Sequence, residues 1–124
     1  NRWQFYRGIS GSLNCAMRSG GTNEILINGG TISQSTWHHV ALCKIGAETG
    51  IYVDGSQVAY DASFTGDTFA GSLYFGQLGH SSQNYDGRND EWAIEYSNIF
   101  NAAPNSTPDD TISIDTNNPL GLVI

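Results

Sequence analysis

The chain of 124 residues contains 15 glycines, and only 14% of its residues are charged, against about 25% in a typical globular domain. This composition disfavours a long charged helix, and the 39% apolar and 11% aromatic fractions exclude a disordered chain. Twelve acidic residues against five scattered basic ones give a net charge of −7, so neither nucleic acid nor an anionic membrane is an expected partner. No apolar run approaches the roughly 20 residues that insertion into a bilayer needs. We therefore expect a single, turn-rich all-β domain.

The first part of the chain contains short stretches rich in β-branched and aromatic residues, separated by glycines and small polar residues. Stretches of this kind predict β-strands. In chain order they are residues 3–7, 13–18, 24–28, 31–34 and 37–45. The Gly29-Gly30 pair is predicted to form the turn between residues 24–28 and 31–34.

The stretch at 37–45 is the longest predicted strand. Because successive side chains of a strand point to opposite faces, the stretch divides into two sets. One face carries Trp37, His39, Ala41 and Cys43, and the other carries His38, Val40, Leu42 and Lys44. Both faces include apolar residues, so the strand is expected to be central in its sheet and partly covered on both sides.

Further strands are predicted at residues 50–53, 56–60, 72–77 and 90–96. Between the first two, Asp54-Gly55 supplies the positive φ angles that a tight type I′ hairpin turn requires. The connections leave no room for crossover helices, so the strands are expected to pair antiparallel. Strands recurring at roughly 8–12 residues indicate a two-sheet sandwich or a barrel.

Residues 101–124 differ in composition from the rest of the chain. They hold all three prolines, together with many Asn, Ser, Thr and Asp residues. Such a composition predicts an extended tail or linker. Residues 119–124 are apolar again and form a candidate terminal edge strand.

The two cysteines, Cys15 and Cys43, leave two alternatives open. They form one disulfide, or they are two buried thiols that behave as small hydrophobic residues. No Cys/His spacing typical of a zinc site is present.

Three stretches resemble the concanavalin A-like, laminin G-like jelly-roll family, which also includes pentraxins. Trp37-His38-His39-Val40-Ala41-Leu42, Ile51-Tyr52-Val53-Asp54-Gly55 and residues 85–94 resemble its motifs in order and spacing. The resemblance implies an antiparallel β-sandwich over residues 1–100 that lacks the family's usual N-terminal strands. It also implies a binding fold for glycans or proteins at the rim loops, sometimes with calcium. Residues 100–104 are similar to the exit of such domains in phage tail and surface proteins.

An enzyme is not expected. The glucanase members of such folds carry a motif resembling E-x-D-x-x-E, but here Trp92 stands where its middle Asp would be. Glu91 and Glu95 lie about 13 Å apart along an extended strand. Paired catalytic carboxyl groups of glycosidases are about 5–5.5 or 6.5–9.5 Å apart. The sequence contains neither a G-x-S-x-G elbow nor the surroundings of an activated cysteine.

No metal or cofactor is firmly indicated by the residues. His38 and His39 are adjacent on a predicted strand, so they point to opposite faces and cannot chelate one ion. Calcium is left open, because Asp86 and Asp90 could contribute carboxylate oxygens beside loop carbonyls. Against it, Gly76-Gln77 is not followed by the acids that the pentraxins gather at that place.

The best candidate binding residues lie in one polar loop. It offers planar amides, hydroxyls, an aromatic ring and an acid, the groups that bind sugar hydroxyls and stack on sugar faces. The candidate ligand-binding residues are His80, Gln83, Asn84, Tyr85 and Asp86. The same residues also suit an ordinary solvated loop. Five other aromatic residues are expected in the core or at an interface rather than in a stacking platform, namely Trp3, Tyr6, Tyr52, Tyr60 and Trp92.

These observations favour a non-catalytic binding or adhesion module. We expect a glycan or surface glycoprotein as ligand, neighbouring protein subunits as further partners, and display on a virion or another extracellular assembly. The alternative is a purely structural subunit that decorates a capsid or assembles a tail. Glycoside hydrolysis is the least favoured function.

Overall fold

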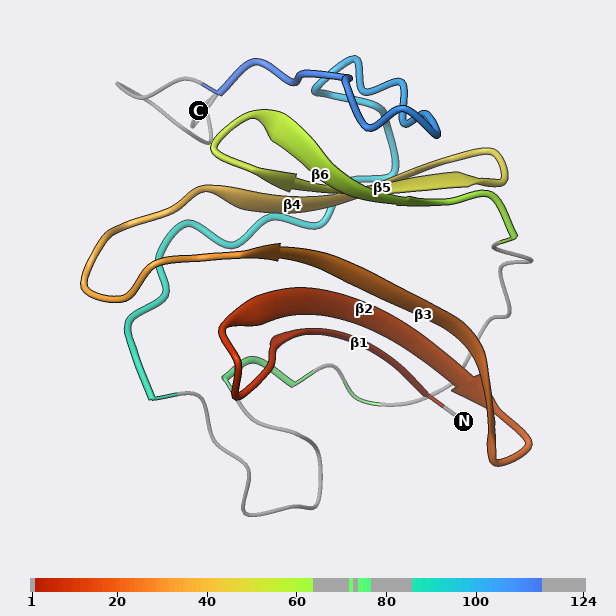
Figure 1. Ribbon diagram of the computed structural model, residues 1–124, viewed down its shortest axis with the longest axis horizontal. Helices are drawn as coiled ribbons and strands as arrows, with labels where there is room; N and C mark the ends of the chain where they lie inside the picture. The colour runs from red at the N-terminus through yellow and green to blue at the C-terminus, as the bar shows by residue number, and fades with distance from the viewer. Residues whose placement is uncertain (1, 64–71, 73, 77–85, 115–124) are drawn as a thin grey trace.

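The computed structural model describes residues 2–63, 72, 74–76 and 86–114, with the side chains of residues 23–25 excepted. The regular elements within these residues are six strands, which form two antiparallel sheets of three. The two sheets lie face to face in two layers (Figure 1). The predicted all-β sandwich with antiparallel pairing is thereby confirmed. No helix long and apolar enough to cross a membrane occurs in this described part.

The first sheet is built from consecutive strands in the order β1 (Arg2–Arg7), β2 (Ser12–Ser19) and β3 (Thr22–Thr31). β2 lies in the middle, and its alternate residues Leu13, Cys15 and Met17 are buried in the core. Gly20 and Gly21 both have positive φ and make a two-residue turn into β3. This turn has the hairpin geometry that two glycines adopt without steric strain.

The turn predicted at Gly29-Gly30 is absent, because both glycines continue β3 in the same direction. The reason is close packing between the sheets. A Cβ atom at Gly29 would lie 3.3 Å from Cδ1 of Ile51, and one at Gly30 would lie 3.4 Å from Cβ of Val58. Glycine therefore allows β3 to lie close to the second sheet, and the pair is a packing feature rather than a turn.

The second sheet contains β4 (Val40–Ile45), β5 (Glu48–Val53) and β6 (Ser56–Asp61) in that order. β5 and β6 are joined by Asp54-Gly55, with φ angles of 50° and 86°. This confirms the predicted type I′ hairpin, because both central residues of the turn have a left-handed backbone conformation.

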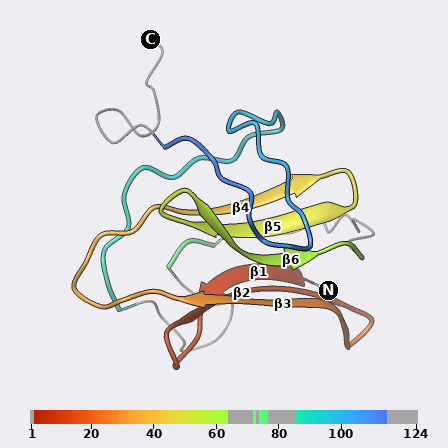
Figure 2. The ribbon, with the colours of Figure 1, turned by 45° about the horizontal axis from the view of Figure 1, so that its top comes forward.

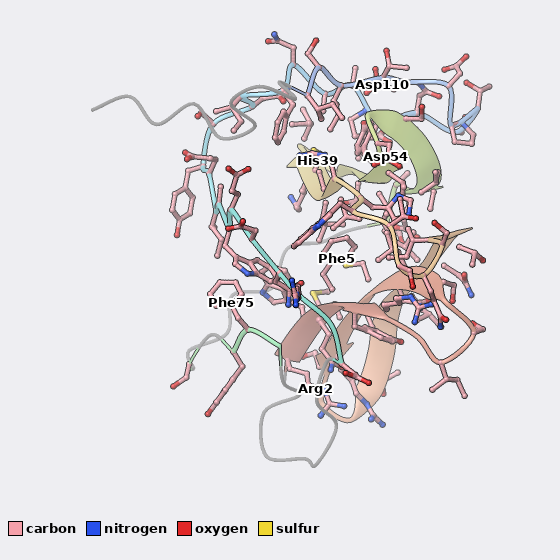
Figure 3. All side chains as sticks on the ribbon, turned by 90° about the vertical axis from the view of Figure 1, so that its left-hand side faces the viewer. Arg2, Phe5, His39, Asp54, Phe75 and Asp110 are labelled. Carbon is pink, nitrogen blue, oxygen red and sulfur yellow. The ribbon has the colours of Figure 1, made fainter. Side chains whose placement is uncertain are left out.

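The main core lies between the two sheets. Its buried members are Leu13, Cys15, Met17, Ile27, Ile51 and Ala59. Phe5 also points into this space from β1 (Figure 3). Burying a side chain the size of Ile51 stabilises a fold by about 1.5–3 kcal/mol, so this layer supplies much of the stability of the domain.

A third layer covers the outer face of the second sheet. The C-terminal strap, residues 101–114, crosses β5 and β6 on the side away from the first sheet (Figures 1 and 2). Ala102 and Ile112 are buried against Tyr52. The strap is also hydrogen-bonded to the hairpin, with Ile112 N donating to Gly55 O at 2.8 Å. Residues 101–114 are thus extended, but they are packed on the domain and do not form a free tail; residues 115–124 lie outside the described residues.

Polar side chains anchor this strap as well. The buried Tyr52 hydroxyl donates to Oδ2 of Asp110 at 2.7 Å, and the same oxygen accepts the Ala103 N–H at 2.8 Å. The hydrogen bond from Tyr52 is the main cause that lowers the pKa of Asp110. Burial, followed by the bond to Asp110, raises the pKa of Tyr52. Gln57 completes the attachment through bonds in both directions with the backbone of Asn105.

β4 begins at Val40, so the strand predicted from residue 37 was too long. The backbone of His39 bonds to Asp54 instead of to a neighbouring strand: its N–H donates to Asp54 Oδ1, and its carbonyl accepts from Asp54 N. Within the described residues β4 pairs with β5 alone and is an edge strand, not the central one that was predicted. Coverage of both faces is confirmed, since Leu42 packs on the main core while Ala41 and Cys43 pack under the strap.

Two further predicted strands differ in the structure. Residues 90–96 are irregular and exposed. The side chain of Asp90 accepts the Glu91 N–H, and Glu91 has a left-handed φ of 52°, which interrupts an extended chain. The described residues of the stretch at 72–77, which are 72 and 74–76, form no strand.

Both cysteines are free thiols. Cys15 lies in the main core, whereas Cys43 packs on the opposite face of the second sheet. Burial, with a smaller contribution from a nearby aspartate in each case, raises the pKa of each thiol to about 11. Of the two alternatives, the structure therefore has the pair of thiols, and it keeps both of them protonated and unreactive.

Candidate functional site

One end of the sandwich gathers the exposed segments that could form a site. The loop at residues 32–39, the β5–β6 turn and the segment 86–97 all lie at this end, on the left in Figure 1 and facing the viewer in Figure 3. The loop at residues 32–39 follows β3, and Asp54-Gly55 forms the β5–β6 turn. The segment 86–97 runs along the same end of the two sheets. Three parts of the chain that are distant in sequence therefore share one surface.

An exposed aromatic pair is the most distinctive feature of this surface. The rings of Phe75 and Trp92 are 4.4 Å apart between centroids and tilted by 51°. Phe75 is 49% exposed and Trp92 is 55% exposed. Trp92 was expected in the core or at an interface. Its exposure excludes the core, because residues 90–96 form no strand that would turn it inward, and the interface stays a prediction.

The chain around Trp92 is acidic. Residues 86–95 contain Asp86, Asp90, Glu91 and Glu95 against the single Arg88, and these five side chains belong to exposed residues. A ligand with a negative charge would therefore meet an unfavourable potential here. Within the described residues no three His, Cys, Asp or Glu side chains gather as a metal site.

Of the five candidate ligand-binding residues, Asp86 is the one within the described part of the chain. His80, Gln83, Asn84 and Tyr85 lie outside the described residues. Asp86 is exposed at the start of the acidic segment. The candidate calcium ligands Asp86 and Asp90 are both exposed, and their role in binding stays a prediction.

A hydrogen-bonded chain of three side chains was not foreseen from the sequence. Ser33 Oγ lies 2.8 Å from His38 Nε2, and His38 Nδ1 lies 2.7 Å from Asp54 Oδ2. Oδ1 of the same carboxylate accepts the His39 N–H at 3.0 Å. The sequence feature that could have indicated this contact is Asp54, which lies 16 residues after His38. Asp54 was predicted only as a residue of the hairpin turn.

These three hydrogen-bonded side chains have the order hydroxyl, imidazole, carboxylate that serine hydrolases use. Acyl transfer also needs donors that are free to stabilise an oxyanion, and the nearby His39 N–H is already occupied by Asp54. The side chain of His38 is only 15% exposed, whereas that of Asp54 is 50% exposed. The side chains of Ser33, His38 and Asp54 form a clip that joins the loop at residues 32–39 to the hairpin turn.

His39 faces a different environment from His38. Its ring makes an edge-on contact with Phe100 at 5.7 Å between centroids, and its Nδ1 is buried without a hydrogen-bond partner. Burial lowers the pKa of His39, and the nearby Asp54 carboxylate opposes this shift only in part. A neutral imidazole is therefore favoured, and the two histidines have separate partners, as expected for side chains that point apart.

A family model described as the concanavalin A-like lectin/glucanases superfamily, of laminin G type, matches residues 1–103. The chain belongs to this superfamily. No curated protein and no solved structure matches the chain. The match covers both sheets and the segment that carries Trp92, and it ends where the strap begins to cross the second sheet.

The concanavalin A-like lectin/glucanase superfamily includes both binding proteins and hydrolases. The residues of this chain must therefore distinguish between a binding role and a hydrolytic role. A glycosidase needs two carboxyl groups held at a fixed spacing around the glycosidic bond, and one of them must stay protonated in a shielded site. The described candidates, Glu91 and Glu95, are both exposed on an irregular segment. The exposed rings of Phe75 and Trp92, in contrast, offer apolar ring faces of the kind that can stack on a ligand.

Proposed function

We propose that this domain is a non-catalytic carbohydrate-binding module that captures a glycan, or the glycan of a surface glycoprotein, at the end of the sandwich. The observation that carries the proposal is the half-exposed Phe75–Trp92 pair. The electron-rich face of an aromatic ring attracts the polarised C–H groups on one face of a pyranose. Polar groups around the pair would bind the sugar hydroxyls.

The charge of the segment refines the ligand class. Four carboxylates against one guanidinium in residues 86–95 favour neutral sugars over sialylated, sulfated or uronic acid chains. The predicted loop residues His80, Gln83, Asn84 and Tyr85 remain part of this proposal, next to Asp86. Display on an extracellular assembly such as a virion, beside other protein subunits, also remains proposed, on the sequence resemblance.

A glycan array probed with the full chain tests this function. We expect retention of neutral glycans, and we expect Trp92→Ala to weaken their binding about tenfold, the effect of losing one stacking contact of about 1.4 kcal/mol. Trp3→Ala is the matched control, since Trp3 is 51% exposed on β1 and should leave binding unchanged. Retention of no glycan by the unchanged chain, or equal binding by Trp92→Ala, would refute the proposal.

A further inference from the structure

The loop that joins the two sheets is closed by its own side chains. The bond between Ser33 Oγ and His38 Nε2 closes residues 33–38 into a ring. Within it, the Thr36 hydroxyl reaches the Gln34 carbonyl at 3.5 Å, and Ser35 has a left-handed φ of 61°. These local bonds hold the segment in a compact conformation, as in other short loops whose side chains cap their own backbone.

The same loop is also fixed to the rest of the domain. Asp54 accepts from the His38 ring at 2.7 Å and from the His39 N–H at 3.0 Å, and its own N–H donates to the His39 carbonyl at 2.9 Å. Asp54 is itself held in the left-handed conformation of the β5–β6 turn. The carboxylate therefore ties the loop to a hairpin whose geometry is set independently.

This fixed loop presents a large aromatic side chain to solvent. Trp37 is 66% exposed, although it is adjacent to the well-shielded His38. Its neighbours Gln34, Ser35 and Thr36 offer two hydroxyls and one planar amide, and residues 31–37 carry no charge. Because the backbone that carries this indole is already fixed, the loop loses little freedom when a ligand binds, which favours affinity.

We propose that residues 34–37 form a second saccharide subsite, with Trp37 as its stacking residue. This inference rests on the proposed function, and it extends it from a single sugar contact to a chain of several sugar units. The loop and the segment that carries Trp92 lie at the same end of the sandwich in both ribbon views (Figures 1 and 2). The ligand is therefore a neutral oligosaccharide that contacts Trp92 and Trp37 with different units.

Two-point contact makes affinity depend on chain length. Once one unit is bound, a second unit of the same chain is present at high effective concentration near the other subsite. A chain too short to reach both aromatic residues gains nothing from the second one. Ser33, His38 and Asp54 lie outside this subsite and are positioning residues, because they fix the loop and do not touch the sugar.

The test uses full-length protein and immobilised neutral gluco-, galacto- and manno-oligosaccharides, each with two and six units. For the sugar type that is retained, Trp37→Ala should weaken binding of the six-unit chain about tenfold and leave that of the two-unit chain unchanged. Trp92→Ala should weaken both lengths, and Trp37→Phe should restore part of the loss. Trp3→Ala, an exposed tryptophan on β1, is again the matched control.

The positioning role has its own readout. Asp54→Asn and Ser33→Ala should both reduce the advantage of the six-unit chain over the two-unit chain while two-unit binding persists. Ser33→Ala keeps the hairpin turn intact, so it reports on the loop even where Asp54→Asn destabilises the fold. Thermal unfolding of each variant identifies such a loss of folding.

The outcomes separate the two proposals. If Trp92→Ala weakens binding of both lengths and Trp37→Ala binds both lengths as the unchanged chain does, the second subsite is refuted and the carbohydrate-binding function stands. This is also the result expected if Trp37 serves as a protein contact. If none of the oligosaccharides is retained by the unchanged chain, both proposals fail.

Discussion

Two adjacent histidines show how much the surroundings of a residue decide its chemistry. His38 lies between a serine hydroxyl and a carboxylate, with both ring nitrogens in hydrogen bonds. His39 has its Nδ1 buried without a partner and its ring against Phe100. Protonating His39 would therefore place a charge where neither water nor an acceptor at Nδ1 can stabilise it.

The first prediction concerns the pH dependence of stability. Burial lowers the pKa of His39 in the folded state, whereas an unfolded histidine titrates near a pKa of about 6.5. The unfolded chain then binds more protons at this position, so stability is complete above about pH 6.5 and is lost as the pH falls through the folded pKa. Urea unfolding between pH 7.5 and 5.5 should show this decline, and His39→Gln should flatten it. An unchanged slope in His39→Gln would assign the decline to another group.

At the scale of elements, the β5–β6 hairpin supports both the clip and the strap. Gly55 has a φ of 86°, and its carbonyl accepts the Ile112 N–H from the strap at 2.8 Å. A Cβ atom at Gly55 would lie 2.9 Å from the Ile112 carbonyl oxygen, closer than such atoms approach. Glycine is therefore required at position 55 for two reasons: the positive φ of the turn, and the strap packed over it.

The second prediction separates these two restrictions. Gly46 joins β4 to β5 with a φ of 63°, but a Cβ atom there would meet nothing within 4 Å. Gly46→Ala should lower the free energy of unfolding by about 1–2 kcal/mol, the cost of a left-handed alanine. Gly55→Ala carries this cost and the clash with the strap, and should lose about 2–4 kcal/mol. Denaturant unfolding measures both, and equal losses would show that the strap does not press on the turn.

Sequence patterns predicted those elements whose cause is local. The Asp54-Gly55 turn and the alternating strands around it follow from φ preferences and burial, and they are confirmed. The patterns failed where tertiary contacts decide. Gly29-Gly30 continues a strand because Ile51 and Val58 pack against it, and His38 and His39 leave the strand because the carboxylate of Asp54 binds them.

The candidate site was only partly predictable for the same reason. The family resemblance predicted a binding surface at the rim loops, and the polar loop that ends at Asp86 was its candidate; both stay predictions. Trp92 was expected in the core or at an interface, and a strand was predicted around it. The left-handed backbone of Glu91, which interrupts this strand, leaves no pattern in the sequence. The contact of Ser33 and His38 with Asp54 joins residues from a loop and a turn, which no local periodicity connects.

At the scale of the whole molecule, the fold is a two-sheet sandwich with a strap bound across its outer face. The superfamily match ends at residue 103, while the strap continues to residue 114. Tyr52 is fully buried because the strap covers it, and Gln57 is buried with its side chain bonded to Asn105. The outer face of the second sheet thus depends on residues beyond the matched region.

The third prediction tests this dependence. A chain ending after Phe100 would expose Tyr52 and leave the Gln57 side chain without Asn105, so we expect it to lose more than about 3 kcal/mol of stability or to remain unfolded. A chain ending after Ile114 keeps every contact described above and is the control. In the full chain, Ile112→Ala should cost about 2–4 kcal/mol by leaving a cavity against Tyr52. If thermal unfolding of the chain ending after Phe100 matched that of the control, residues 101–114 would be a dispensable linker, and the sandwich would be stable with its outer face exposed to water.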